Sequence, residues 1–229
     1  MESKIGCFII HGFGGSLEEI NQLKEYLNAI GIKTVCPILK GHGKSSRDLK
    51  GVKYSEWISS AEEEFIKLGS ECDKIYLAGF SMGGLISINI AIKHEVQGII
   101  FMNTPVYHWD IKRITINIMN DIQNRNSEYI KFYLKAIIAF PIEALYNFKS
   151  ILIKTKPLIN SIDCPIFIAQ ALKDDTVHKK SAEYIFKNIS SEKKLIKYYK
   201  NSNHIICQSP DKEELFDDIR EFVQESLLD

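Results

Sequence analysis

Short apolar segments alternate with longer amphipathic segments along most of this chain, and the alternation limits the folds open to it. Six short apolar runs have the pattern of buried strands; they are residues 5–10, 33–36, 74–78, 97–102, 165–170 and 194–199. The first helical segment begins at Ser16, with Glu19 three residues later in the pattern of a capping box, and Gly31 ends it. Strands that alternate with helices form a parallel sheet covered on both faces through right-handed crossovers. We therefore predict an α/β fold with about six strands in a mainly parallel sheet.

The composition is that of a soluble globular chain. Its 229 residues are within the range of one α/β domain, and 45% of them are hydrophobic. Basic and acidic residues both number 29, so no net positive charge attracts nucleic acid. No apolar run reaches about 18 residues, the length of a membrane-spanning helix. We expect neither a nucleic acid partner nor integral membrane association.

The N-terminus and the cysteines bear on the compartment. Residues 1–4 lead directly into the first strand, without the basic and long apolar regions of a signal peptide. The five cysteines are an odd number without a CxxC pair, so we interpret them as reduced thiols of a cytoplasmic protein. No cluster of side chains has the spacing of metal ligands, and we predict neither a metal nor a cofactor.

Residues 106–161 are longer than one crossover between the fourth and fifth strands requires. They contain three amphipathic helical patterns and many aromatic side chains. We predict a helical cap at about 106–161, inserted into a single domain that spans 1–229. Aromatic residues on such a cap would line an apolar pocket, and Phe132, Tyr133 and Phe140 are the candidates for substrate binding. Alternatively, these side chains only pack the cap onto the core.

A serine lies where the third strand is expected to turn into a helix. The segment is Gly79-Phe80-Ser81-Met82-Gly83, a G-x-S-x-G motif between an apolar run and a helical pattern. Its glycines allow a turn so sharp that side chains would collide with the neighbouring strand and helix. Ser81 is therefore the predicted nucleophile; the alternative is a tight turn with an ordinary serine.

A serine nucleophile needs a base and an orienting acid, and strand order indicates both. Of the six histidines only His204 follows the last strand, so it is the candidate general base. Asp174 and Asp175 follow the fifth strand. Because Asp174 is closer to that strand, we expect it to orient the imidazole, whereas Asp175 caps the turn or faces solvent.

Acyl transfer also needs backbone donors for the negative charge on the carbonyl oxygen. Met82 is expected to supply one N–H group. Phe13, in the glycine-rich loop His11-Gly12-Phe13-Gly14-Gly15 after the first strand, is expected to supply the other, and its ring could line the acyl pocket. A phosphate-binding loop is excluded, since neither the P-loop pattern nor a GxGxxG follows the strand.

Taken together, these motifs resemble the α/β-hydrolase superfamily, and in particular small bacterial carboxylesterases and monoacylglycerol lipases with a short helical cap. The match includes the glycine loop after the first strand, Gly41-His42-Gly43-Lys44-Ser45 after the second, the serine motif, the segment 174–177 and His204. The chain begins at the family's third strand, so the resemblance implies a six-stranded core. It also implies ester hydrolysis without a cofactor, through an acyl-Ser81 intermediate.

The expected substrate is a small-molecule carboxylic ester. A compact apolar cap suits short to medium acyl chains, with monoacylglycerols among the candidates. The first alternative is hydrolysis of acyl thioesters by the same three residues, since the motif does not distinguish an oxygen from a sulfur leaving group. The second is a non-catalytic module that binds a small apolar ligand in the same pocket.

Overall fold

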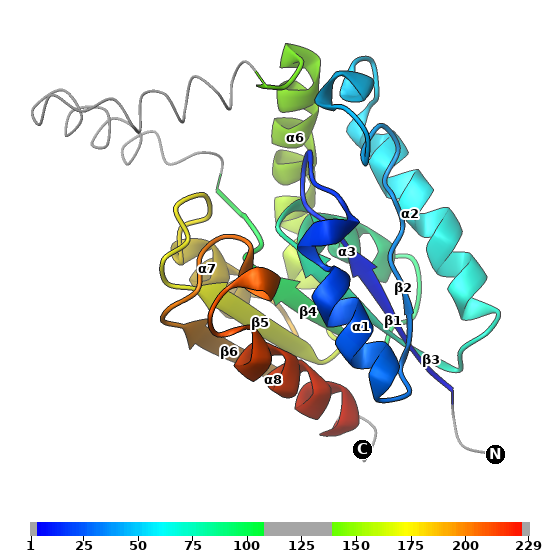
Figure 1. Ribbon diagram of the computed structural model, residues 1–229, viewed down its shortest axis with the longest axis vertical. Coiled ribbons are helices and arrows are strands. Elements are labelled where there is room, and N and C mark those ends of the chain that lie inside the picture. Colours follow the sequence, from blue (N-terminus) through cyan, green and yellow to red (C-terminus); the bar gives the residue numbers. More distant parts are fainter. Residues whose placement is uncertain (1–3, 108–138, 226–229) are drawn as a thin grey trace, which may run out of the picture.

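A computed structural model describes residues 4–107 and 139–225, and in these residues six parallel strands form one sheet (Figure 1). The strands are β1 (Ile5–Ile10), β2 (Lys33–Val35), β3 (Lys74–Phe80), β4 (Gly98–Met102), β5 (Ile166–Ala171) and β6 (Lys194–Tyr199). They lie in the order β2-β1-β3-β4-β5-β6, and every neighbouring pair is parallel. The predicted sheet is thus confirmed, and its carboxyl ends share one edge.

Helices cover both faces of the sheet. They are α1 (Asn21–Ala29), α2 (Tyr54–Gly69), α3 (Met82–Ala91), α6 (Ile142–Thr155), α7 (Lys180–Asn188) and α8 (Lys212–Glu225), with 3-10 turns at Leu17–Glu19, Ser46–Leu49, Lys156–Ser161 and Ile206–Gln208. Residues of α1 and α8 pack on one face of the sheet, and residues of α2, α3, α6 and α7 pack on the other. This is the layered arrangement that the alternating sequence predicts.

The strands supply both cores because successive side chains point to opposite faces. In β1, Phe8 and Ile10 join the core under α2 and α3, whereas Cys7 and Ile9 join the core under α1 and α8. All four are fully buried. An almost continuous apolar strand is the expected sequence of a parallel sheet covered on both faces.

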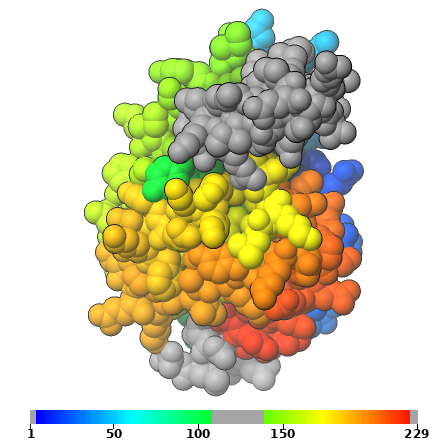
Figure 2. Space-filling view, turned by 90° about the vertical axis from the view of Figure 1, so that its left-hand side faces the viewer, coloured from blue at the N-terminus to red at the C-terminus, as the bar shows by residue number. Residues whose placement is uncertain are grey.

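The described part of the expected cap is residues 106–107 and 139–161, which include α6 and the turn Lys156–Ser161. In Figure 1, α6 extends beyond the carboxyl edge of the sheet. In Figure 2, the described residues around 142–155 extend higher than those of β5, α7 and β6. The buried side of α6 also packs against α2 and α3. Phe132 and Tyr133 lie outside the described residues, and so does most of the segment predicted to form the cap. The cap boundary at 106–161 therefore stays a prediction.

One local prediction is wrong. Ser16 caps the turn Leu17–Glu19 by accepting the Glu18 N–H, but Glu19 does not complete the capping box. Its carboxylate instead accepts the N–H of Gly12 at 3.2 Å, in the glycine loop after β1. A short 3-10 turn leaves this side chain free to reach the neighbouring loop, where a buried N–H needs an acceptor.

The cysteines and the described helices bear on disulfide bonding and on membrane insertion. All five cysteines are free thiols. Among the helices that the structure describes, none combines the length and the apolar character that crossing a membrane requires. The cytoplasmic location stays a prediction.

Candidate active site

Ser81 lies in the sharp turn between β3 and α3. Its backbone has φ 52° and ψ −118°, a region that residues with a side chain rarely adopt and that costs about 1–3 kcal/mol. A Cβ on Gly83 would lie 2.1 Å from the carbonyl oxygen of Ile10, and one on Gly79 would lie 2.3 Å from the Gly84 nitrogen. Glycine is therefore required on both sides of the serine. The turn presents Ser81 at the carboxyl edge of the sheet.

His204 and Asp174 come together from the loops after β6 and β5. Asp174 Oδ2 lies 2.9 Å from His204 Nδ1, and Asp174 Oδ1 accepts the N–H groups of Thr176 and Val177, both at 2.8 Å. The Asp174 side chain is buried, so its carboxylate is fixed. Asp175 is exposed and contacts the Thr176 hydroxyl. A carboxylate at His204 Nδ1 leaves Nε2 without its proton and able to act as a base.

Three hydrogen bonds orient the peptide group between Gly12 and Phe13. His11 Nε2 accepts the N–H of Leu39 at 3.2 Å, which places the ring proton on Nδ1. That Nδ1–H donates to the Gly12 carbonyl at 2.8 Å, and the N–H of Gly15 donates to the same oxygen at 3.3 Å. Since the C=O and N–H of a trans peptide point in opposite directions, the Phe13 N–H is directed away from the His11 ring.

Met82 is the first residue of α3 and is fully buried. The N–H groups in the first turn of a helix have no partner within the helix. This N–H is therefore able to donate to an oxygen atom outside the helix. The Met82 and Phe13 N–H groups are the two donors that the sequence predicts for the oxyanion.

Ser81 and His204 line one cavity of about 220 Å³. Among the described residues, the rest of the wall is mostly apolar and is formed by Gly12, Phe13, Glu19, Phe80, Pro105, Tyr107, Phe140, Leu145, Phe148, Thr176 and Val177. The Phe13 ring lies 4.9 Å from that of Phe140 and 5.1 Å from that of Phe148, measured between centroids. The glycine loop and the later part of the predicted cap segment thus form one aromatic wall.

Comparisons with known proteins agree with this arrangement. A family model for the alpha/beta hydrolase fold matches residues 8–119. A solved structure of one of the metagenome-derived lipolytic enzymes LipS and LipT has a TM-score of 0.82 at 21% identity, covering 97% of this chain and 94% of that one. The chain has the α/β-hydrolase fold. The resemblance inferred from the sequence is confirmed.

Two bacterial proteins are similar to this chain over nearly their whole length. A thermostable monoacylglycerol lipase of Bacillus sp. (strain H-257) is 28% identical over 229 aligned residues, which cover 95% of this chain and 90% of the lipase. A carboxylesterase of Bacillus subtilis (strain 168) is 23% identical, with 94% of this chain and 91% of the esterase covered.

Sequence reasoning missed two polar residues of this α/β-hydrolase site. Asn103, just after β4, donates from Nδ2 to the carbonyls of Asn203 and His204 at 3.3 and 2.8 Å, and its Oδ1 accepts the Ala171 N–H at 2.8 Å. It thereby ties the His204 loop to the ends of two strands. In the sequence, the position of Asn103 directly after a strand could have indicated that it lies at the site. Glu19 was assigned to a helix cap instead.

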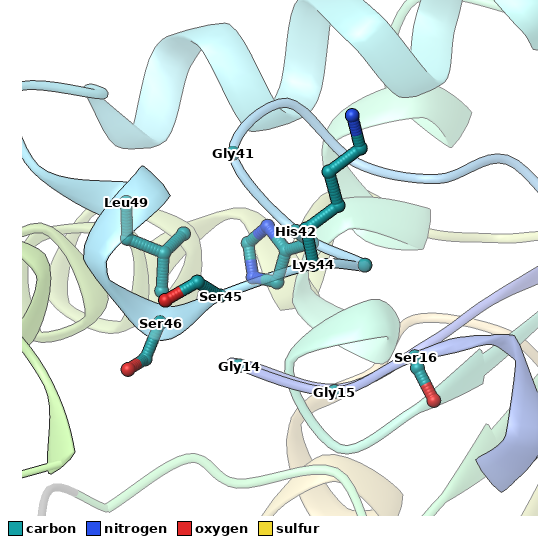
Figure 3. Close-up of a pocket in the computed structure, with 10 residues that line it drawn as sticks. Gly14, Gly15, Ser16, Gly41, His42, Lys44, Ser45, Ser46 and Leu49 are labelled. Carbon is teal, nitrogen blue, oxygen red and sulfur yellow. The ribbon is translucent and has the colours of Figure 1, made fainter.

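A second, smaller hollow of about 90 Å³ lies beside the glycine loop of the α/β-hydrolase fold (Figure 3). Gly14, Gly15 and Ser16 form one side, and the segment Gly41–Ser46 with Leu49 forms the other. The Lys44 side chain extends away from the Gly14–Ser16 segment (Figure 3). Among their described lining residues, the two hollows have none in common. The smaller hollow is therefore separate from the cavity at Ser81.

Proposed function

We propose that this chain is a serine hydrolase that cleaves carboxylic esters of short to medium acyl chains, monoacylglycerols among them. The observation that carries the proposal is a strained serine that shares a cavity with a histidine held by a buried carboxylate. Lipases and esterases among the relatives support ester hydrolysis by a chain of this fold.

The proposed reaction has two halves. Ser81 Oγ attacks the ester carbonyl carbon while His204 Nε2 takes the hydroxyl proton, and the Phe13 and Met82 N–H groups stabilise the oxyanion. The oxyanion then collapses, the bond to the alcohol oxygen breaks, and His204 gives its proton to that oxygen. Water attacks the acyl-Ser81 carbonyl with His204 again as base, which frees the acid and restores the serine.

Asp174 has an electrostatic and a positioning role in this scheme. Its carboxylate fixes the Nδ1–H tautomer of His204 and stabilises the imidazolium that forms in both halves. The bonds from the Thr176 and Val177 N–H groups hold the carboxylate in place, so that it need not reorganise during the reaction.

The apolar wall of the cavity suits the acyl part of the ester. Phe13, Phe140, Leu145, Phe148 and Val177 surround the space near Ser81. Contact with these side chains removes the acyl chain from water, which stabilises binding by about 0.8 kcal/mol for each buried methylene. A cavity of about 220 Å³ favours a modest chain over a polymer.

The test is covalent labelling combined with kinetics. A fluorophosphonate should label wild-type protein at Ser81, as peptide mass spectrometry would show, and Ser81→Ala should neither be labelled nor hydrolyse p-nitrophenyl esters. Loss of the nucleophile typically costs about 10⁴-fold or more in kcat. Ser87→Ala is the matched control, because Ser87 is a buried serine of α3, the helix that Ser81 precedes, and among the described residues its hydroxyl bonds only the Gly83 carbonyl. Hydrolysis by Ser81→Ala within tenfold of wild type would refute the proposal.

A further inference from the structure

Glu19 brings a carboxylate into the wall of the cavity that holds Ser81 and His204. Among the described lining residues it is the only acidic one. Its Oε2 accepts the N–H of Gly12, whereas Oε1 has no hydrogen-bond partner among the residues that the structure describes. One oxygen is therefore fixed by the glycine loop, and the other can accept a hydrogen bond from a ligand.

Glu19 lies on the His204 side of this cavity. A Cβ on Gly12 would lie 3.4 Å from Glu19 Oε2 and 3.2 Å from the Phe80 ring, so the carboxylate and Phe80 flank the same glycine. The Phe80 ring in turn lies 5.0 Å from the His204 ring. Burial raises the pKa of Glu19, while the Gly12 hydrogen bond and the charge of His204 lower it. The last effect requires Glu19 and His204 to be near one another.

The position of His204 determines where the alcohol part of an ester lies. This inference rests on the proposed function. His204 gives its proton to the leaving oxygen, so that oxygen and the carbon chain attached to it lie against the imidazole. The acyl chain extends instead along the aromatic wall of Phe13, Phe140 and Phe148. Among the described residues that line the cavity, Glu19 is then the acidic side chain on the alcohol side.

We propose that Glu19 recognises the alcohol part of the substrate by accepting a hydrogen bond from a hydroxyl group on it. The enzyme then favours esters of a neutral polyol such as glycerol over esters of a plain alkyl alcohol with the same acyl chain. An alcohol that carries a phosphate group is disfavoured, since the half-buried Glu19 carboxylate repels it. Recognition of this kind acts only on acylation, because the alcohol has left before deacylation begins.

The experiment compares kcat/KM for monooctanoylglycerol and methyl octanoate. Both esters form the same acyl-enzyme, so the ratio of the two values reports recognition of the alcohol alone. We expect wild type to favour the glyceryl ester by about tenfold, the effect of one hydrogen bond to a charged group, and Glu19→Ala to abolish that preference. Glu19→Gln, whose amide oxygen still accepts the Gly12 N–H, should keep a reduced preference and should hydrolyse octanoyl glycerol phosphate better than wild type does.

Glu18→Ala is the matched control, since Glu18 is the exposed neighbour and does not line the cavity. It should keep the wild-type ratio. If Glu19→Ala and Glu19→Gln lower both activities by one common factor, Glu19 only positions the glycine loop and the inference is overturned. If wild type hydrolyses neither ester, the proposed function fails first, and the inference fails with it.

Discussion

At the scale of single residues, two adjacent aspartates have different surroundings. Asp174 is 3% exposed and touches His204, whereas Asp175 faces solvent and bonds only Thr176 among the described residues. Asp174→Asn should therefore lower kcat by about 10⁴-fold, the cost measured for the same change in a serine protease, because the amide favours the wrong imidazole tautomer. Asp175→Asn, the matched control, should retain activity close to that of wild type. Steady-state kinetics on p-nitrophenyl butyrate would distinguish the two, and a reversed ranking would contradict the assignment of roles.

Motif order in the sequence was sufficient to predict Ser81, Asp174 and His204 as a group, because each follows a particular strand. Glu19 could not be predicted in this way, and Asn103 was not predicted although it follows β4 directly. The position of Glu19 three residues after Ser16 is typical of a capping box, and only the folded glycine loop offers the competing N–H of Gly12. Asn103 acts through backbone carbonyls of residues about a hundred positions away, which no local pattern reveals.

At the scale of elements, strands and helices followed from apolar periodicity, but only part of the cavity wall was predicted. Phe13 and Phe140 were candidates and line the cavity, whereas Phe148 was not among the candidates. The periodicity of residues 142–155 predicts a helix there, and α6 is that helix. It does not predict which of its side chains contact the cavity, because that depends on the angle between α6 and the sheet. Phe148 of α6 and Phe140, just before this helix, line the cavity and contact Phe13, whereas Tyr146 of α6 is 71% exposed.

Phe148→Ala should therefore change acyl chain-length preference. The smaller side chain enlarges the cavity, so kcat/KM should shift towards longer acyl chains, with each accommodated methylene contributing about 1–3 kcal/mol. Phe140→Ala should act in the same direction. A series of p-nitrophenyl esters from acetate to dodecanoate would measure the profile, with Tyr146→Ala as the control. An unchanged profile in folded variants would mean that these rings only pack the region together and that other walls determine specificity.

At the scale of the whole molecule, buried imidazoles connect the loops after β1 and β2. The ring of His42 lies 5.1 Å from that of His11, 5.6 Å from that of Trp57 and 6.2 Å from that of Phe13. Burial lowers the pKa of both histidines, and for His42 the value is about 4, with the charge of His11 as a second cause. His42 Nδ1 contacts the Lys40 carbonyl at 3.2 Å. Neutral rings thus support the loop that carries the Phe13 N–H.

This burial predicts that acid destabilises the fold. An unfolded histidine binds its proton near pH 6.5, whereas folded His42 does so only near pH 4. Between these values the unfolded state holds more protons, so the free energy of unfolding falls by up to about 1.4 kcal/mol per pH unit for such a group. The neutral His42 ring makes its full contribution to the free energy of unfolding above about pH 6.5, and this contribution is lost by about pH 4. His11 adds to the loss, and Glu19, whose pKa is raised by burial, opposes it in the lower part of this window.

Urea unfolding at a series of pH values between about 7 and 5 would measure this dependence. His42→Asn can keep the bond to the Lys40 carbonyl but does not titrate, so its stability should fall less with acid than that of wild type, by about 1 kcal/mol per pH unit over the steepest part. Trp57→Phe is the control: it removes packing against His42 without removing a titrating group and should keep the wild-type dependence on pH. Equal slopes for His42→Asn and wild type would mean that His42 binds its proton at the same pH in the folded and the unfolded state, and would contradict the buried neutral imidazole between the two loops.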